Sequence, residues 1–288
     1  MKVLITGAGG QLGRALQATV PAGVDPVALD RAALDIGDAA AVMARVRDLA
    51  PALVINAAAY TAVDKAESDA VAAHRINAEA PGHLAAAASA VGARFIHVST
   101  DFVFDGTSGT PYRPDHPTAP LGVYGATKLA GEQAVRSAQP DALIVRTAWV
   151  YGDAGHNFVR TMLRLMAERD EVRVVADQIG TPSYATGLAR ALWALDAAGA
   201  TGIHHWTDSG AASWYDFAVA IQEEALAIGL LTRAVPVIPI ATSDYPTPAR
   251  RPSYSVLDKS AAVALVGACA PHWRVHLREM LGVIKTHG

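Results

Sequence analysis

Tyr124 and Lys128 stand four residues apart, and this pair could move a proton. On an α-helix, residues at that spacing lie on one face, one turn apart. A lysine ammonium beside a phenol favours the phenolate, so we predict that the pKa of Tyr124 falls from about 10 towards neutrality. Such a phenol can exchange a proton with an alcohol or ketone oxygen. Alone, the spacing is weak support, because most such pairs merely lie on an exposed helix face.

A glycine-rich turn near the start of the chain gives the pair a context. Residues 2–6 are an apolar run typical of a strand, and residues 14–17 favour a helix. Between a strand and a helix, a glycine turn lets backbone N–H groups bind the pyrophosphate of a dinucleotide. A tight turn without a ligand is the alternative. The predicted cofactor contacts here are Gly7, Gly9, Gly10, Gln11, Leu12 and Gly13.

An acidic residue, Asp30, follows the glycines at a distance of about 20 residues, after a second predicted strand. A carboxylate there can accept hydrogen bonds from the adenosine ribose. Arg31 could bind a 2′-phosphate, although it could equally be an ordinary surface arginine. These two residues leave NAD and NADP both open, and we expect NADPH as the cofactor, with NADH possible.

Apolar runs alternate with helical stretches through the first half of the chain. Strands are predicted at residues 53–56, 94–98 and 142–145, and helices at 39–49 and 79–91. This alternation predicts an α/β fold with a doubly wound, Rossmann-like parallel sheet, whose ligands bind beyond the carboxyl ends of the strands. We predict an NAD(P)-binding domain over residues 1–150. Residues 151–288 should form mainly a smaller substrate-binding lobe, interleaved with the sheet.

Length and composition agree with one compact enzyme. The chain has 288 residues, 51% of them hydrophobic, and a formal net charge of −3. This charge gives no reason to expect a nucleic-acid partner, and we see neither a basic amphipathic helix nor an apolar run long enough to suggest a membrane. Cys269 is the only cysteine, and the histidines show no metal-ligand spacing, so no metal site is predicted. Without a recognisable signal peptide, a cytoplasmic location is expected.

Together the motifs resemble a known family. The glycine turn, the run Asn56-Ala57-Ala58-Ala59, the run Ser99-Thr100-Asp101 and the Tyr124/Lys128 pair are similar to those of the extended short-chain dehydrogenase/reductases. Longer strings at residues 59–67, 99–106, 146–152, 177–182 and 250–252 resemble the dTDP-4-dehydrorhamnose reductase family within that group. Two positions depart from the family pattern, Ser183 and Ser255. Both fall in the predicted substrate lobe.

The resemblance implies reduction of the 4-keto group of a dTDP-4-dehydro-6-deoxy sugar by NADPH or NADH, giving dTDP-L-rhamnose. It assigns proton donation to Tyr124 and a hydrogen bond on the same oxygen to Thr100. Lys128 would lower the tyrosine pKa and hold the nicotinamide ribose. Further implied cofactor contacts are Asp35, Ile36, Ala57, Ala58, Ala59 and Tyr60. Implied substrate contacts, besides Thr100, are Asp101, Trp149, Asn157, Gln178 and Arg251.

Several alternatives stay open at this point. Trp149 could be a core residue, Asn157 a turn residue, and Asp64 with Glu67 a helix cap. The chain could instead be an epimerase or dehydratase of the same superfamily, or a non-catalytic subunit resembling the regulatory partner of methionine adenosyltransferase. A monomer or a homodimer is expected, and whether Mg²⁺ bridges such a dimer is left undecided.

Overall fold

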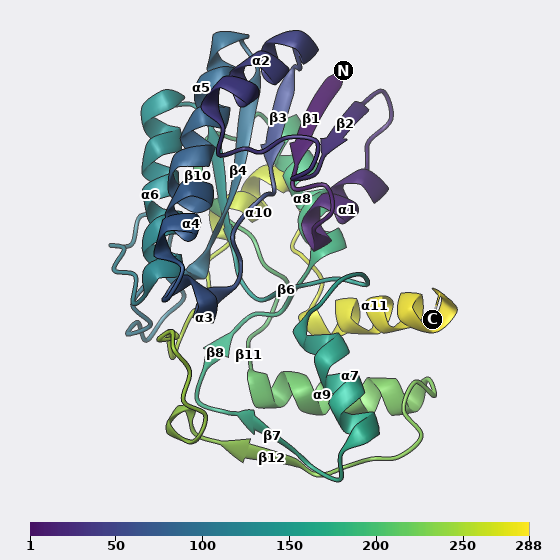
Figure 1. Cartoon of the computed structure of the whole chain (residues 1–288). Coiled ribbons are helices and arrows are strands. Elements are labelled where there is room, and N and C mark those ends of the chain that lie inside the picture. Colours follow the sequence, from purple (N-terminus) through teal and green to yellow (C-terminus); the bar gives the residue numbers. More distant parts are fainter. Residues whose placement is uncertain (288) are drawn as a thin grey trace.

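Six parallel strands form the central sheet of the structure, a computed structural model that describes residues 1–287 (Figure 1). Their spatial order is β10-β5-β4-β3-β1-β2, so the order reverses between β1 and β3. Ligands of doubly wound sheets bind at such a reversal, outside the carboxyl ends of the strands. The strands are β1 (Lys2–Thr6), β2 (Asp25–Leu29), β3 (Leu53–Asn56), β4 (Arg94–Thr100), β5 (Leu143–Thr147) and β10 (Gly202–His205).

Helices cover both faces of this sheet, and strands such as β1 and β3 accordingly carry apolar, buried side chains on both sides. In β1, Val3 and Ile5 pack with the helices of one face, and Leu4 packs with those of the other. Such strands read as continuous apolar runs, which is why the parallel sheet was predictable. One face carries α2 (Ala39–Leu49), α5 (Ala80–Ala90) and α6 (Val123–Ala138); the other carries α1 (Gln11–Ala18), α8 (Ala185–Ala197) and α10 (Ser260–Val266).

A smaller lobe lies beyond the sheet, at the bottom of Figure 1, with its own apolar core. Its helices are α7 (Phe158–Glu168), α9 (Trp214–Ala227) and α11 (Trp273–His287), which pack with the parallel pair β7 (Val172–Val175) and β12 (Val237–Ile240). Short paired strands join lobe and sheet: β6 (Val150–Tyr151), β8 (Ile179–Gly180), β9 (Ser183–Tyr184) and β11 (Ala212–Ser213).

The predicted parallel α/β sheet is confirmed, and residues beyond 150 contribute to it through β10, α8 and α10. Between β3 and α5 the chain forms α3 (Val63–Ala66), α4 (Ala70–His74) and a π-helical turn, Arg75–Glu79. That turn occupies the start of the helix expected at residues 79–91. Two 3₁₀ turns complete the elements, Asp101–Val103 and Thr242–Asp244. Within residues 1–287, no helix combines the length and apolar character needed to cross a membrane.

Candidate active site

The turn after β1 touches the loop after β3 at the point where the strand order reverses. Gly7 has φ of +75°, and a Cβ added to it would lie 2.6 Å from the backbone nitrogen of Ala58. Gly13, in α1, packs directly against the carbonyl of Gly7, where no side chain fits. Gly10 directly precedes α1 and has no side chain to cap it, which leaves the first backbone N–H groups of the helix available to an anion.

The loop after β2 lies beside this turn, because the N–H of Ala8 donates to the carbonyl of Leu29 at 3.1 Å. Asp30 and Arg31 follow directly and are both exposed. Oδ1 of Asp30 accepts from the backbone N–H groups of residues 32 and 33, each at 3.0 Å, which holds the carboxylate at the mouth of the loop. Both residues therefore stand next to the glycine turn, as a dinucleotide site requires.

Two other predicted cofactor contacts have partners within the protein. Asp35 forms an ion pair with Arg75 at 2.6 Å, and this hydrogen bond holds the pKa of Asp35 below its ordinary value. Ile36 is buried in the core on the α2 face of the sheet. A contact from either residue to a cofactor stays a prediction.

The loop of residues 57–60 is held by a residue that the sequence reasoning missed. Asn77, in the π-helical turn, is 1% exposed and exchanges two hydrogen bonds with the backbone of Tyr60, at 2.8 and 3.0 Å. Its Nδ2 also lies 3.3 Å from Oγ1 of Thr127 in α6. Asn77 therefore ties the predicted cofactor loop to the helix that bears Tyr124 and Lys128. In the sequence, the only sign of this role is that Asn77 is a lone asparagine in a helical stretch.

Lys128 is turned towards the sheet. Its side chain is 2% exposed, and Nζ donates to the carbonyl of Val98 at 2.7 Å. The same nitrogen lies 3.4 Å from Nε2 of His97, also in β4. Burial lowers the pKa of Lys128 to about 8, and the charge of Glu132 acts in the opposite direction.

The prediction for the pKa of Tyr124 is wrong in this structure. Burial raises it to about 12, against a lowering hydrogen bond with Thr100 and with a further increase from the charge of Asp101. Lys128 does not lower it, because its amine is committed to β4. Tyr124 is consequently a neutral phenol, which is the protonation state that a proton donor needs.

Thr100 and Asp101 stand at the carboxyl end of β4, next to Tyr124. The ring of Phe102 packs edge-on against Tyr124 with centroids 5.4 Å apart, which brings this turn to the start of α6. Oγ1 of Thr100 donates to Oδ1 of Asp101 at 3.0 Å and accepts from the N–H of Phe102. Asp101 is 1% exposed, and burial raises its pKa to about 6, although a hydrogen bond from Ser255 acts to lower it.

Trp149 and Gln178, two of the predicted substrate contacts, come from the segments that join sheet and lobe. Trp149 has an unusual φ of +47° and stacks on Trp214 with ring centroids 3.5 Å apart. A Cβ on Gly180 would lie 2.6 Å from the Trp149 ring, so much of that ring is already covered. Gln178 is mostly buried and donates to Oγ1 of Thr242 at 3.0 Å. A strained backbone at Trp149 is typical of functional positions.

Asn157 is buried at the start of α7 and is bonded within the protein, and its contact with the substrate stays a prediction. Its Oδ1 accepts from the N–H of Arg160 at the start of α7, and its Nδ2 donates to Gln11 and to the carbonyl of Gly152. All its polar groups are thereby used. Because Gln11 belongs to the glycine turn, Asn157 ties the lobe to the predicted cofactor site.

Arg251 is bonded to a carboxylate rather than left free for a phosphate. It forms an ion pair with Asp64 at 2.8 Å, and this contact lowers the pKa of Asp64. The alternative that Asp64 and Glu67 cap their own helix is wrong, because α3 has no side-chain cap; Oε1 of Glu67 instead accepts from the N–H of Val123 at the start of α6. That contact fixes the first turn of the helix on which Tyr124 stands.

A buried ion pair behind the site was also not predicted. Arg146 of β5 makes two hydrogen bonds to Glu132 of α6, at 2.8 and 2.7 Å, and Ser99 donates to the same carboxylate. The pair joins α6 to the carboxyl ends of β4 and β5. Opposite charges in sequence-distant elements give no local signal, which is why the pattern alone did not reveal it.

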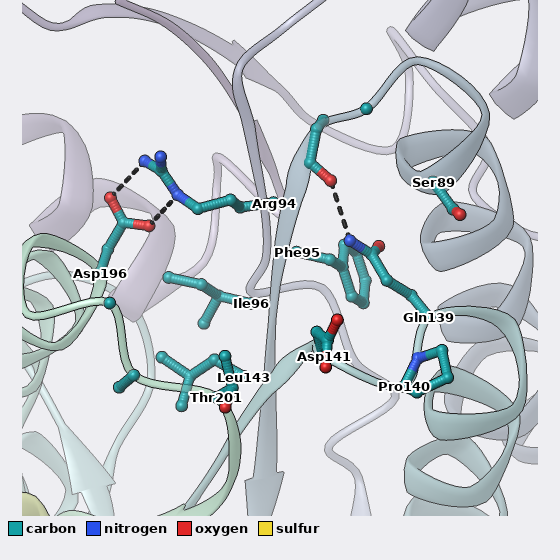
Figure 2. Close-up of a pocket in the computed structure, with 14 residues that line it drawn as sticks. Ser89, Arg94, Phe95, Ile96, Gln139, Pro140, Asp141, Leu143, Asp196 and Thr201 are labelled. Atoms are coloured by element: carbon teal, nitrogen blue, oxygen red, sulfur yellow. Dashed lines mark hydrogen bonds and ion pairs between the residues drawn. The ribbon is translucent and has the colours of Figure 1, made fainter.

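A surface cavity in this structure lies away from these residues (Figure 2). It is lined by Arg94 and Leu143, the first residues of β4 and β5, and by Asp196 at the end of α8, which pairs with Arg94 at 2.7 Å. Those are the amino ends of the strands, at the opposite edge of the sheet from Thr100. This cavity is therefore not the candidate active site. Across residues 1–287, no group of three or more His, Cys, Asp or Glu side chains is arranged to hold a metal ion.

This chain is similar to known proteins along nearly its whole length. A family model described as the RmlD substrate binding domain matches residues 1–285. A dTDP-4-dehydrorhamnose reductase of Burkholderia thailandensis is 47% identical over 285 residues, covering 95% of this chain and 96% of that protein. One from Mycobacterium tuberculosis is 47% identical, with 97% of this chain and 92% of that protein covered.

Solved structures of similarly named proteins have the same fold. The crystal structure of a dTDP-4-dehydrorhamnose reductase from Clostridium acetobutylicum superposes with a TM-score of 0.94 at 42% identity, covering 99% of this chain and 100% of the other. That of Bacillus anthracis, in complex with NADP, gives a TM-score of 0.92 at 38% identity, covering 98% and 99%.

Proposed function

Because the chain belongs to the dTDP-4-dehydrorhamnose reductase family, we propose that Thr100, Tyr124 and Lys128 carry out its reaction. That reaction is the NADPH-dependent reduction that completes dTDP-L-rhamnose, in which the 4-keto group of dTDP-4-dehydro-β-L-rhamnose becomes an alcohol. The observation that supports these roles is that Tyr124 and Thr100, from different elements, meet at the carboxyl edge of the sheet, the edge that also carries the glycine turn.

The residues present fit a dinucleotide. Gly7 and Gly13 keep the turn close to the backbone, and the uncapped start of α1 offers free N–H donors for a pyrophosphate. When bound, NADPH supplies the hydride. Asp30 would hold the adenosine ribose, Arg31 the 2′-phosphate, and Lys128 the nicotinamide ribose. Since Asp30 also suits an unphosphorylated ribose, NADH should support turnover as well.

Proton transfer falls to Tyr124. As hydride arrives at the sugar carbon, negative charge develops on the keto oxygen, and the neutral phenol gives its proton to that oxygen. Thr100 has one hydroxyl proton, which Asp101 accepts in this structure. Rotation of that hydroxyl would aim the proton at the keto oxygen and stabilise its charge. Asp101, Trp149 and Gln178 would contact the sugar nucleotide from around this point.

The test is to incubate the protein with NADPH and dTDP-4-keto-6-deoxy-L-lyxo-hexose and to identify the sugar product. A reductase consumes one NADPH for each dTDP-L-rhamnose formed. An epimerase or dehydratase would alter the sugar without net loss of NADPH, and a regulatory subunit would leave both unchanged. Repeating the assay with NADH, and with Arg31→Ala, addresses cofactor choice: loss of Arg31 should weaken NADPH selectively.

A further inference from the structure

A series of buried, hydrogen-bonded polar side chains runs through His97 and links the loop after β3 to Lys128. The imidazole of His97 comes from β4 and is fully buried. Its Nδ1 lies 3.1 Å from Nδ2 of Asn56, and its Nε2 lies 3.4 Å from Nζ of Lys128. Burial, with the charge of Lys128 adding to it, holds the pKa of His97 well below its ordinary value, so the ring is neutral.

The backbone at Ala58 determines which ring nitrogen carries the proton. Oδ1 of Asn56 accepts from the N–H of Ala58 at 3.1 Å and from the hydroxyl of Thr6 at 2.8 Å. With its oxygen fixed there, Asn56 must present its Nδ2–H donor to Nδ1 of His97. A neutral imidazole that accepts at Nδ1 carries its proton at Nε2. That Nε2–H faces the amine of Lys128.

An N–H group that faces a lysine favours the neutral amine over the ammonium. An ammonium has only donors, whereas a neutral amine has a lone pair that can accept. Lys128 already donates to the carbonyl of Val98 at 2.7 Å. We propose that His97 is a positioning residue that holds the Lys128 amine through Nε2–H and makes its proton easier to lose. The same series of hydrogen bonds begins at Ala58, against which Gly7 packs, so it also links Lys128 to the glycine turn.

The inference rests on the proposed function, since there Lys128 holds the nicotinamide ribose of the cofactor. Two other titratable groups, both on α6, lie near Lys128. Glu132 lies one turn further along α6, favours the ammonium and is itself paired with Arg146. Tyr124, one turn earlier, is a neutral phenol and adds no charge. Of these titratable groups, His97 is therefore the one that contacts Nζ and presents a donor to it.

Two substitutions at His97 separate the contact with Lys128 from packing. His97→Gln keeps an N–H near the position of Nε2. His97→Asn keeps only an acceptor for Nδ2 of Asn56 and has no group at the position of Nε2. Activity of the wild type should fall at alkaline pH as Lys128 loses its proton. We expect His97→Asn to move this alkaline limb of the kcat profile upward by about one pH unit, a tenfold change in proton affinity. His97→Gln should keep the limb near its wild-type position. An unmoved limb in a folded His97→Asn protein, or equal shifts in both variants, would overturn the proposal.

The tautomer can be measured without any turnover. Nitrogen-15 NMR of labelled histidine should show His97 protonated at Nε2 and not at Nδ1, with its signals identified by their loss in His97→Asn. Asn56→Asp offers a carboxylate to Nδ1 and should move the proton there, which leaves Nε2 to accept from Lys128 and again raises the alkaline limb. An Nδ1–H form in the wild type would contradict the inference.

The pH dependence of NADPH affinity, measured by calorimetry, gives the same limb independently of catalysis. If the wild type binds NADPH with the expected limb and tautomer but does not reduce the dTDP-sugar, the proposed function fails while the role of His97 stands. If turnover is normal and His97→Asn leaves the limb of NADPH affinity unmoved, the role of His97 fails alone.

Discussion

Arg251 and Asp64 are joined by two hydrogen bonds, at 3.0 and 2.8 Å, although 187 positions separate them in the chain. Arg251 also donates to the hydroxyl of Thr247 and the carbonyl of Ala249, so it organises residues 247–251 against the segment after β3. A bidentate carboxylate occupies the donors that a phosphate would need. Binding of a sugar nucleotide would then require Arg251 to share or exchange this partner.

Substitution of each partner distinguishes a phosphate contact from a loop clamp. If Arg251 binds phosphate, Arg251→Gln should raise KM for the dTDP-sugar about tenfold or more, because a hydrogen bond to a charged group contributes about 1.5–3 kcal/mol. Asp64→Asn should leave KM unchanged or lower it, because the arginine is freed. If the pair only clamps the loop, the two variants should behave alike. In both, KM should rise and the melting temperature should fall, by similar amounts.

The glycine turn offers a matched pair of substitutions. Any Cβ at Gly13 meets the carbonyl of Gly7, so Gly13→Ala should lower the free energy of unfolding by about 1–3 kcal/mol. A Cβ at Gly9 has no protein atom within 4 Å, so Gly9→Ala should fold with an unchanged melting temperature. If the open space beside Gly9 is where the pyrophosphate lies, the same variant should bind NADPH more weakly in calorimetry. Unchanged affinity would remove Gly9 from the predicted contacts.

Local pattern was enough to predict the sheet and the position of the site. β1, β3 and α2 have the bounds predicted from their apolar runs, because a strand buried on both faces needs apolar residues throughout. The glycine turn and Thr100 follow strands in sequence, so their place at the carboxyl edge followed from the parallel topology. Residues whose role depends only on their own strand or turn were therefore predictable.

Partners chosen across long sequence distances were not predictable. The Lys128 amine could have faced Tyr124, and helical spacing places it there, but the carbonyl of Val98 competes for it and prevails. Asp35, a predicted cofactor contact, is likewise bonded to Arg75 of the protein itself. Such choices depend on which polar groups the fold leaves nearby, since a buried donor must find an acceptor. Hydropathy and spacing carry no information on that.

Asp101 should make the stability of the protein depend on pH in an unusual direction. Its pKa is about 6 in the folded chain and 3.8 in the unfolded one, so between these values the folded state binds more protons. The free energy of unfolding therefore falls as pH rises from about 4 to 6 and stays lowered above that range. Asp101→Asn should remove the penalty and stabilise the protein by up to about 3 kcal/mol at pH 7.5.

Urea unfolding at pH 4.5 and 7.5 measures this effect, and Asp105→Asn serves as the matched control. The pKa of Asp105 is lowered, first by the backbone N–H of Thr107 and then by the hydroxyl of Tyr112. Its contribution is therefore present at neutral pH and lost in acid, so the control should be less stable than the wild type at pH 7.5. A loss of stability in Asp101→Asn at pH 7.5 would show that Asp101 is ionised and favourably solvated.

Tyr124→Phe tests the proposed proton donor while keeping the ring and its edge-on contact with Phe102. General acid catalysis typically contributes about 10²–10⁴-fold, so kcat should fall by about that factor. Affinity for NADPH should change little, because Lys128 and the glycine turn are untouched. Lys128→Met should impair both, since it removes the group proposed to hold the ribose and leaves the carbonyl of Val98 without its donor. If the pair only supported a helix, each change would cost a few tenths of a kcal/mol and turnover would survive. Near-wild-type kcat in Tyr124→Phe, at saturating substrate and cofactor, would mean that another group donates the proton.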